Sequence, residues 1–126
     1  MSVNLADFPV GPAIAVSDME RARGFYEGKL GLSGAESGDG GRDYQCGEGT
    51  GIHVFPSPAF TGPTGATALG WAVDDLAAAV DDLTGRGVEF ERYDEGDFKT
   101  DEKGILNGMV AWMKDPDGNL ISLNQR

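Results

Sequence analysis

Two residue types that carry out chemistry in many proteins occur once each in this chain, as His53 and Cys46. A single cysteine excludes both an intrachain disulfide and a cysteine-based zinc site. No lysine or histidine is adjacent to Cys46, so we expect a small apolar residue on a strand and not a nucleophile. His53 could contact a ligand, transfer a proton or serve only as a structural residue on its strand. The sequence assigns no carboxylate partner to His53, so we predict no catalytic residue.

Alternation along the chain predicts which side chains share a cleft with His53. Ile52 and Val54 are expected to face the helices, which leaves His53 and Phe55 on the opposite face. Small and large residues alternate in segments 11–16 and 68–73, so the cleft face there carries only Gly and Ala. Larger residues from elsewhere would then either fill the space as core or contact a ligand. The predicted ligand-binding residues are His53, Phe55, Tyr44, Tyr93, Phe98, Trp112, Ser122 and Asn124.

Phe98 lies in a polar, acidic segment over residues 94–104 that contains Gly96 and ends at Gly104. One interpretation is a flap over the cleft with Phe98 as its anchor. The alternative is a solvated, charged loop without a role in binding. The segment lacks the spacing of acidic residues that an EF-hand requires.

The elements that must position these residues occur twice along the chain. Residues 15–19 (AVSDM) align with residues 72–76 (AVDDL) at an offset of 57, and each half predicts a strand, a helix and about three further strands. The first helix is predicted to begin at Ser17, with Glu20 completing a capping box, and the second at Asp74. A further strand is predicted over residues 88–92.

The length of 126 residues predicts one domain, residues 1–126, of the α+β class. It consists of two tandem βαβββ modules, over about residues 8–56 and 67–126, with a Pro/Gly-rich link over 57–66. One such module alone leaves a sheet face uncovered. We therefore expect two modules to form curled mixed sheets around a cleft, with the helices on the outside.

The chain is strongly acidic, with 21 Asp and Glu against 10 Lys and Arg and a net charge of −11. Nucleic acids and anionic membranes bind through positive charge, so this balance argues against either as a partner. The apolar runs are too short to cross a membrane, and the first residues lack the pattern of a secretory signal. We therefore expect a cytoplasmic location.

The duplicated βαβββ pattern resembles the vicinal-oxygen-chelate superfamily, which contains glyoxalase I, extradiol dioxygenases and proteins of fosfomycin and bleomycin resistance. The segments 16–26 (VSDMERARGFY) and 115–123 (DPDGNLISL) carry the resemblance, which covers nearly the whole chain. Catalytic members of this superfamily hold a divalent metal through one residue on each of four strands. The resemblance implies that these positions are Gly11, His53, Ala68 and Ser122. Gly11 and Ala68 have no ligating side chain and Ser122 is a poor ligand, so we expect neither a metal nor another cofactor.

This resemblance is closest to the metal-free bleomycin-resistance type, whose members bind a drug or metabolite without changing it. It implies a metal-independent small-molecule-binding protein for drug or metabolite sequestration. It also implies a cationic or aromatic ligand, held in clefts between the subunits of a homodimer. Two alternatives stay open: a metal-dependent lyase, isomerase or dioxygenase with an atypical ligand set, and a degenerate interaction or regulatory module.

Overall fold

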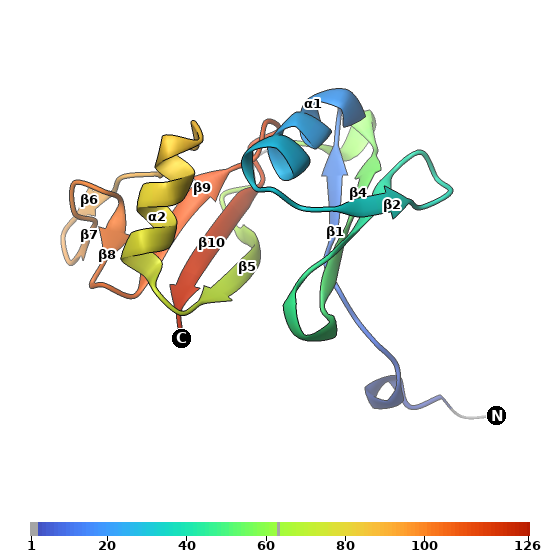
Figure 1. Ribbon diagram of the computed structural model, residues 1–126, viewed down its shortest axis with the longest axis horizontal. Helices are drawn as coiled ribbons and strands as arrows, with labels where there is room; N and C mark the ends of the chain where they lie inside the picture. The colour runs from blue at the N-terminus through green and yellow to red at the C-terminus, as the bar shows by residue number, and fades with distance from the viewer. Residues whose placement is uncertain (1–2, 63) are drawn as a thin grey trace.

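The computed structural model describes residues 3–62 and 64–126, and it has the two-module architecture that the repeat predicts (Figure 1). The first module contains β1 (Ala13–Val16), α1 (Met19–Arg23), β2 (Gly34–Glu36), β3 (Arg42–Gln45) and β4 (Gly51–Pro56). The second contains β5 (Thr67–Val73), α2 (Leu76–Gly85), β8 (Ile105–Leu106), β9 (Val110–Lys114) and β10 (Leu120–Gln125). A short hairpin of β6 (Asp94–Glu95) and β7 (Phe98–Lys99) belongs to the second module.

Each module forms one mixed four-stranded sheet, and the two sheets have the same topology. The strand orders are β1-β4-β3-β2 and β5-β10-β9-β8. In each sheet the first strand pairs in parallel with the last strand of its module, and the other pairs are antiparallel. This arrangement confirms the α+β fold of two βαβββ modules.

Both helices begin one residue later than the sequence predicts. The carboxylate of Asp18 accepts a hydrogen bond from Arg21 N at 3.2 Å, and that of Asp75 accepts one from Ala78 N at 3.1 Å. The predicted cap Ser17 instead donates its backbone N–H to the carboxylate of Asp117, and the predicted cap Asp74 pairs with Arg126. Beyond Arg23 the first helix continues as a π-helical segment over Gly24–Lys29. No helix in the described part of the chain is both long and apolar enough to cross a membrane.

The prediction of a strand over residues 88–92 is wrong. Only Phe90 forms a bridge there, with Met113 of β9, and Glu91 N donates to Trp112 O at 2.8 Å. Gly104 passes close to this segment, since a Cβ atom at Gly104 would lie 2.9 Å from that of Phe90. The loop therefore crosses the segment that would otherwise extend the sheet.

The helix-facing side of each sheet carries the large apolar residues, as the alternation predicts. Ile14 and Val16 of β1 are buried, and Leu69, Trp71 and Val73 of β5 pack partly buried against the same core. This core is continuous from one module to the other. The small residues of β1 and β5 are thereby left on the opposite side of each sheet.

The turn between β9 and β10 attaches the second module to the first. Asp115 accepts a hydrogen bond from Tyr26 Oη at 2.8 Å, and Asn119 Nδ2 donates to Ala15 O at 3.1 Å. Figure 1 shows this turn beside α1. Burial, followed by the charge and the hydrogen bond of Asp115, strongly raises the pKa of Tyr26, so this phenol remains protonated as a donor.

Candidate functional site

The face of each sheet opposite its helix carries most of the predicted site residues. We define the module-one open face by Ala13, Ala15, Asp43, His53 and Phe55, which are neighbours across β1, β4 and β3. We define the module-two open face by Gly70, Ala72, Trp112, Ser122 and Asn124, which are neighbours across β5, β10 and β9. Tyr93 and Phe98 pack onto Trp112 and complete this second face.

His53 is held on the module-one open face between two carboxylates. Its Nδ1 lies 2.8 Å from Asp43 Oδ1, and its Nε2 lies 2.8 Å from Asp39 Oδ2. The imidazole stacks on the ring of Phe55, with 5.5 Å between the ring centroids and 9° between the planes. Only the doubly protonated ring can donate to both carboxylates at once, so this geometry favours an imidazolium.

The pKa shifts of His53 and Asp39 agree with this geometry. Burial by itself lowers the pKa of His53, but the hydrogen bonds and charges of Asp43 and Asp39 outweigh burial, so the net pKa is raised. The Ser37 hydroxyl and the Gly41 amide hold the pKa of Asp39 down to about 2, with a further contribution from His53. Geometry and electrostatics therefore both favour the ion-paired form of this cluster.

Both carboxylate partners of His53 were missed by the analysis of the sequence. The antiparallel register of β3 and β4 places Asp43 directly opposite His53. Asp43 could have been found by extending the alternation of β4 across a hairpin to β3. Asp39 lies in the Gly-rich segment between β2 and β3, where no periodicity indicates its position.

Tyr44 is not part of either open face, which corrects its prediction as a cleft residue. It pairs with Ile52, so its side chain lies on the helix-facing side and is 1 % exposed. Its ring stacks on Tyr26 with centroids 6.0 Å apart, and its hydroxyl donates to Glu27 at 2.8 Å. Burial and the Glu27 carboxylate raise the pKa of Tyr44 to about 12. Tyr44 is therefore a core residue of the first module.

Three aromatic rings gather on the module-two open face. The centroid of Trp112 lies 5.6 Å from that of Tyr93 and 5.3 Å from that of Phe98, and Tyr93 and Phe98 are 5.2 Å apart. Phe98 lies on the β6–β7 hairpin and remains 41 % exposed. The hairpin is thus attached to the sheet through Phe98, while part of the aromatic surface stays open.

Ser122 and Asn124 form the polar part of this face. Asn124 Nδ2 donates to Ser122 Oγ at 2.9 Å and to Trp71 O at 3.3 Å. A Cβ atom at Gly70 would clash with Ser122 Oγ and would lie 2.9 Å from Asn124 Nδ2. The glycine at position 70 therefore admits these two polar side chains and does not leave empty space above β5.

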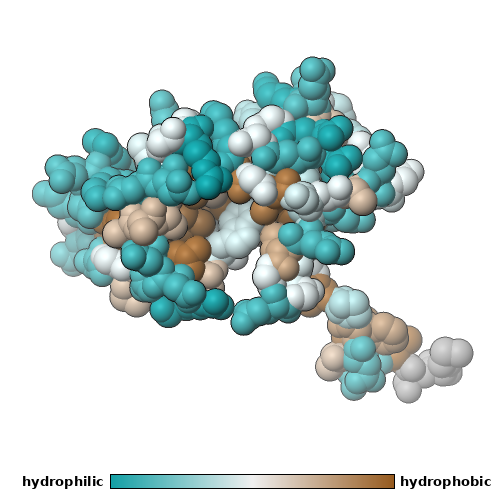
Figure 2. Space-filling model, in the orientation of Figure 1, coloured by the Kyte–Doolittle hydropathy of each residue, from teal (hydrophilic) through white to brown (hydrophobic). Residues whose placement is uncertain are grey.

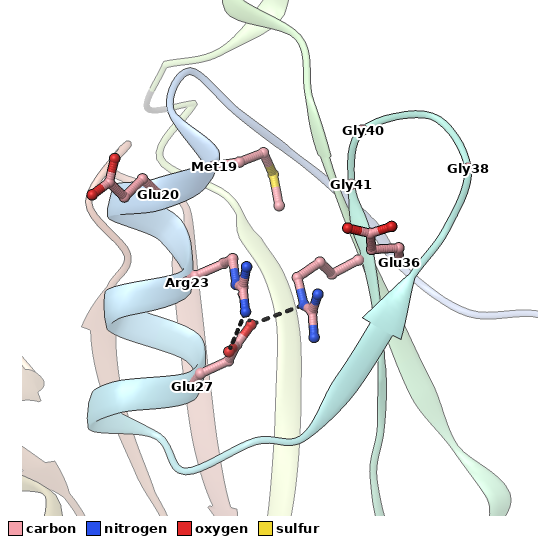
Figure 3. A pocket seen from close by; sticks show the side chains of 9 residues that line it. Met19, Glu20, Arg23, Glu27, Glu36, Gly38, Gly40 and Gly41 are labelled. Atoms are coloured by element: carbon pink, nitrogen blue, oxygen red, sulfur yellow. Dashed lines mark hydrogen bonds and ion pairs between the residues drawn. The ribbon is translucent and has the colours of Figure 1, made fainter.

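One cavity lies outside both open faces. It has a volume of about 650 Å³ between α1 and the segment that joins β2 to β3 (Figure 3). Glu27 lies 2.8 Å from Arg23 Nε and 2.9 Å from Arg42 Nε, and Glu20 and Glu36 add further negative charge. The two arginines are thus neutralised, so the cavity has no surplus positive charge for an anion.

The comparison with known proteins decides the family. The profile of the Glyoxalase/Bleomycin resistance protein/Dioxygenase superfamily matches residues 10–123. The chain belongs to this superfamily. No curated protein matches the chain.

Solved structures of the glyoxalase/bleomycin-resistance superfamily share this fold. A glyoxalase family protein from Enterococcus faecalis is 20 % identical with a TM-score of 0.67, and 90 % of this chain and 94 % of that chain are covered. A glyoxalase/bleomycin resistance protein from Catenulispora acidiphila is 24 % identical with a TM-score of 0.67, covering 93 % and 96 %. TnmS3, an antibiotic binding protein from a Streptomyces species, is 25 % identical with a TM-score of 0.62, covering 94 % and 96 %.

The residues at the four positions that the resemblance implies for metal ligands do not fit a divalent ion. Gly11 and Ala68 offer no side-chain donor, and the hydroxyl of Ser122 accepts from Asn124. Both nitrogens of His53 face the carboxylates of Asp43 and Asp39. Among the described residues, no group of three or more His, Cys, Asp and Glu side chains is arranged to hold a metal ion.

Proposed function

We propose that the protein binds a planar aromatic small molecule, a drug or a metabolite, without a metal ion and without changing it chemically. The observation that carries this proposal is the cluster of Tyr93, Phe98 and Trp112 on the module-two open face. Aromatic surface with a few polar groups at its edge is typical of a small-molecule site. Ser122 and Asn124 supply those polar groups.

Two further observations support binding over catalysis. TnmS3 is named as an antibiotic binding protein, and its likeness to this chain extends over 94 % of the chain at 25 % identity. The metal-ligand positions lack the donors that the metal-dependent chemistry of the superfamily needs. His53 alone, with both nitrogens engaged by carboxylates, offers no free base.

We further propose that the binding site is completed in a homodimer. Apart from the buried Ser122, the residues of both open faces are exposed or half-buried in the single chain, and the superfamily resemblance implies clefts between subunits. The module-one open face contributes Phe55 for stacking and the carboxylates of Asp39 and Asp43 for a cationic group. A planar aromatic ligand with a positive charge would meet both faces with complementary chemistry.

Tryptophan fluorescence tests the binding proposal. The chain has two tryptophans, so Trp71→Phe leaves Trp112 as the only reporter. This variant is titrated with bleomycin and with a panel of planar aromatic antibiotics, both cationic and neutral. We expect saturable quenching of Trp112 by at least one compound, and little change in the matched Trp112→Phe variant, in which Trp71 reports. Absence of saturable quenching across the panel, or equal quenching of both reporters, would contradict the proposal.

A further inference from the structure

Ser122 is a buried polar residue with unused hydrogen-bonding capacity. Hydrophilic side chains dominate the surface in Figure 2, where they can bond to water, but Ser122 is only 7 % exposed. Its Oγ accepts a hydrogen bond from Asn124 Nδ2 at 2.9 Å, and no residue that the structure describes accepts its hydroxyl proton. A buried donor without an acceptor is costly, so an acceptor from a bound molecule would stabilise this hydroxyl.

The carboxamide of Asn124 has a fixed orientation beside Ser122. Its Nδ2 donates to Ser122 Oγ and, at 3.3 Å, to Trp71 O. A backbone carbonyl can only accept, so the nitrogen and not the oxygen of this carboxamide faces Trp71. Within residues 3–62 and 64–126, no group donates a hydrogen bond to Asn124 Oδ1. The two residues therefore present one free donor, the Ser122 hydroxyl, next to one free acceptor, the Asn124 carbonyl.

The neighbouring strand β5 leaves this pair accessible. Gly70 and Ala72 are the register partners of Ser122 and Asn124, and both are exposed. A Cβ atom at Gly70 would clash with Ser122 Oγ, so a glycine is needed there for the serine to keep its place. Neither Gly70 nor Ala72 has a polar side chain that could pair with the free donor or the free acceptor.

Trp112 adds a stacking surface beside the same pair. It is the register partner of Ser122 across β9 and β10, and the rings of Tyr93 and Phe98 pack against it. A planar molecule that lies on the Trp112 ring therefore has an edge near Ser122. Hydrogen bonds to a carbonyl group lie near the carbonyl plane, so groups at the edge of such a molecule can pair with Ser122 and Asn124 while its ring stacks.

We propose that the ligand of this face is a planar aromatic molecule whose edge carries a carbonyl group next to an N–H group, as in a lactam. The carbonyl oxygen accepts from the Ser122 hydroxyl, and the N–H group donates to Asn124 Oδ1. This inference rests on the proposed function, and it names the chemical class of ligand that the same site takes. A site that pairs polar groups of its ligand rejects analogues without them, because its own polar groups then stay unpaired.

A pair of planar compounds tests this inference. Phenanthridinone is a planar aromatic lactam, and its N-methyl derivative keeps the rings and the carbonyl group but lacks the N–H group. We expect the unmodified chain to bind phenanthridinone about tenfold or more tightly than the derivative, because methylation leaves Asn124 Oδ1 without a donor. Isothermal titration calorimetry measures both affinities. Both compounds should lose affinity in Trp112→Ala, which removes the stacking surface.

Two variants assign the hydrogen bonds to their residues. Ser122→Ala removes the donor to the carbonyl group and should weaken binding of both compounds by about tenfold. Asn124→Leu removes the acceptor and should bring the two affinities within about twofold of each other. Ser33→Ala, which changes an exposed serine of the first module, should alter neither affinity. Circular dichroism checks the fold of each variant, and Ser122→Ala decides the test if Asn124→Leu does not fold.

The outcomes separate this inference from the proposed function. Equal affinity of the unmodified chain for the two compounds would overturn the hydrogen-bond assignment and leave the aromatic-binding proposal standing. An unchanged affinity in Ser122→Ala would also overturn it. If neither compound binds, the lactam class is wrong, and the antibiotic panel then decides independently whether the proposed function fails as well.

Discussion

The two open faces share one scaffold and differ in their chemistry. The module-one open face has a charged centre, in which His53 lies between Asp39 and Asp43 and stacks on Phe55. The module-two open face is uncharged and aromatic, with Trp112 at its centre. The same strand order and the same alternation of small and large residues underlie both.

This difference shows which side of the repeat is constrained by folding. The helix-facing side must be apolar in both modules, because it forms one continuous core. The open side is free of that requirement, so the two modules can carry different groups at equivalent places. We infer that a ligand touching both faces would be recognised by charge on one side and by aromatic stacking on the other.

The two open faces can act on one ligand only if the two modules keep their arrangement. The largest expected effect therefore concerns the β9–β10 turn, which attaches the second module to the first. Asp115 is 4 % exposed and accepts hydrogen bonds from Tyr26 Oη, Asn119 Nδ2 and two backbone N–H groups. Asp115→Ala leaves these donors unpaired, so we expect the free energy of unfolding to fall by about 3 kcal/mol or more. Tyr26→Phe removes one of these hydrogen bonds and should cost about 1 kcal/mol. Urea denaturation measures both, and equal losses for the two variants would contradict this account of the link.

Substitution of Trp112 should have the next largest effect. It tests whether the module-two open face contributes most of the free energy of ligand binding. A fully buried aromatic contact contributes about 1.5–3 kcal/mol, so Trp112→Ala should weaken binding of an aromatic ligand by about 10–100-fold. Phe55→Ala on the other open face should weaken it by a smaller factor. Isothermal titration calorimetry with a compound identified by fluorescence compares the two variants. A larger loss for Phe55→Ala would reverse the roles that we assign to the faces.

Phe98 tests the hairpin as a cover of the aromatic face. Because its ring packs on Tyr93 and Trp112 but stays partly exposed, Phe98→Ala should lower the free energy of unfolding by about 1 kcal/mol. The same variant should weaken ligand binding by about three- to tenfold, because it removes part of the stacking surface. Lys99→Ala, its exposed neighbour in β7, is the matched control and should change neither quantity. Unchanged affinity in Phe98→Ala would favour a solvated loop over a flap.

The smallest expected effect concerns the pKa of His53. Proton NMR titration should give a pKa above the ordinary value of about 6.5, and Asp43→Asn should lower it. Asp94→Asn, which removes an exposed carboxylate of the second module, should leave it unchanged. A His53 pKa at or below the ordinary value would contradict the ion-paired cluster.

The same cluster predicts the sign of a pH dependence of stability. Because the pKa of His53 is raised in the folded state, its contribution is fully present below about pH 6.5 and is lost as the pH rises through the folded pKa. The pKa of Asp39 is lowered to about 2, so its contribution is present above the ordinary Asp value and is lost as the pH falls toward 2. His53→Gln should therefore reduce the loss of stability between pH 6 and pH 9 in urea denaturation.

The fold could be predicted because its strongest signals are local and repeated. Alternation in 11–16 and 68–73 predicts which side of β1 and β5 is buried, and the aligned segments 15–19 and 72–76 predict the repeat. The same alternation places His53 and Phe55 on the face that the structure gives them. Their role in binding stays a prediction.

The details that the sequence could not supply depend on contacts between distant segments. Strand β3 has one apolar residue, Tyr44, among polar ones, so nothing in its own pattern shows that this ring faces the core. Both helices begin one residue later than predicted, and the predicted cap residues Ser17 and Asp74 instead contact Asp117 and Arg126 from the end of the chain. Asp39 reaches His53 only because the Gly-rich loop turns back over β4.

Native mass spectrometry of the full chain, purified without chelator and then mixed with the antibiotic panel, tests the central claim most directly. We predict that an organic adduct of defined mass binds, that Trp112→Ala loses it, and that no divalent ion accompanies it. One divalent ion per chain at full occupancy, or the absence of an adduct with every compound, would contradict the account of a metal-independent aromatic-binding protein.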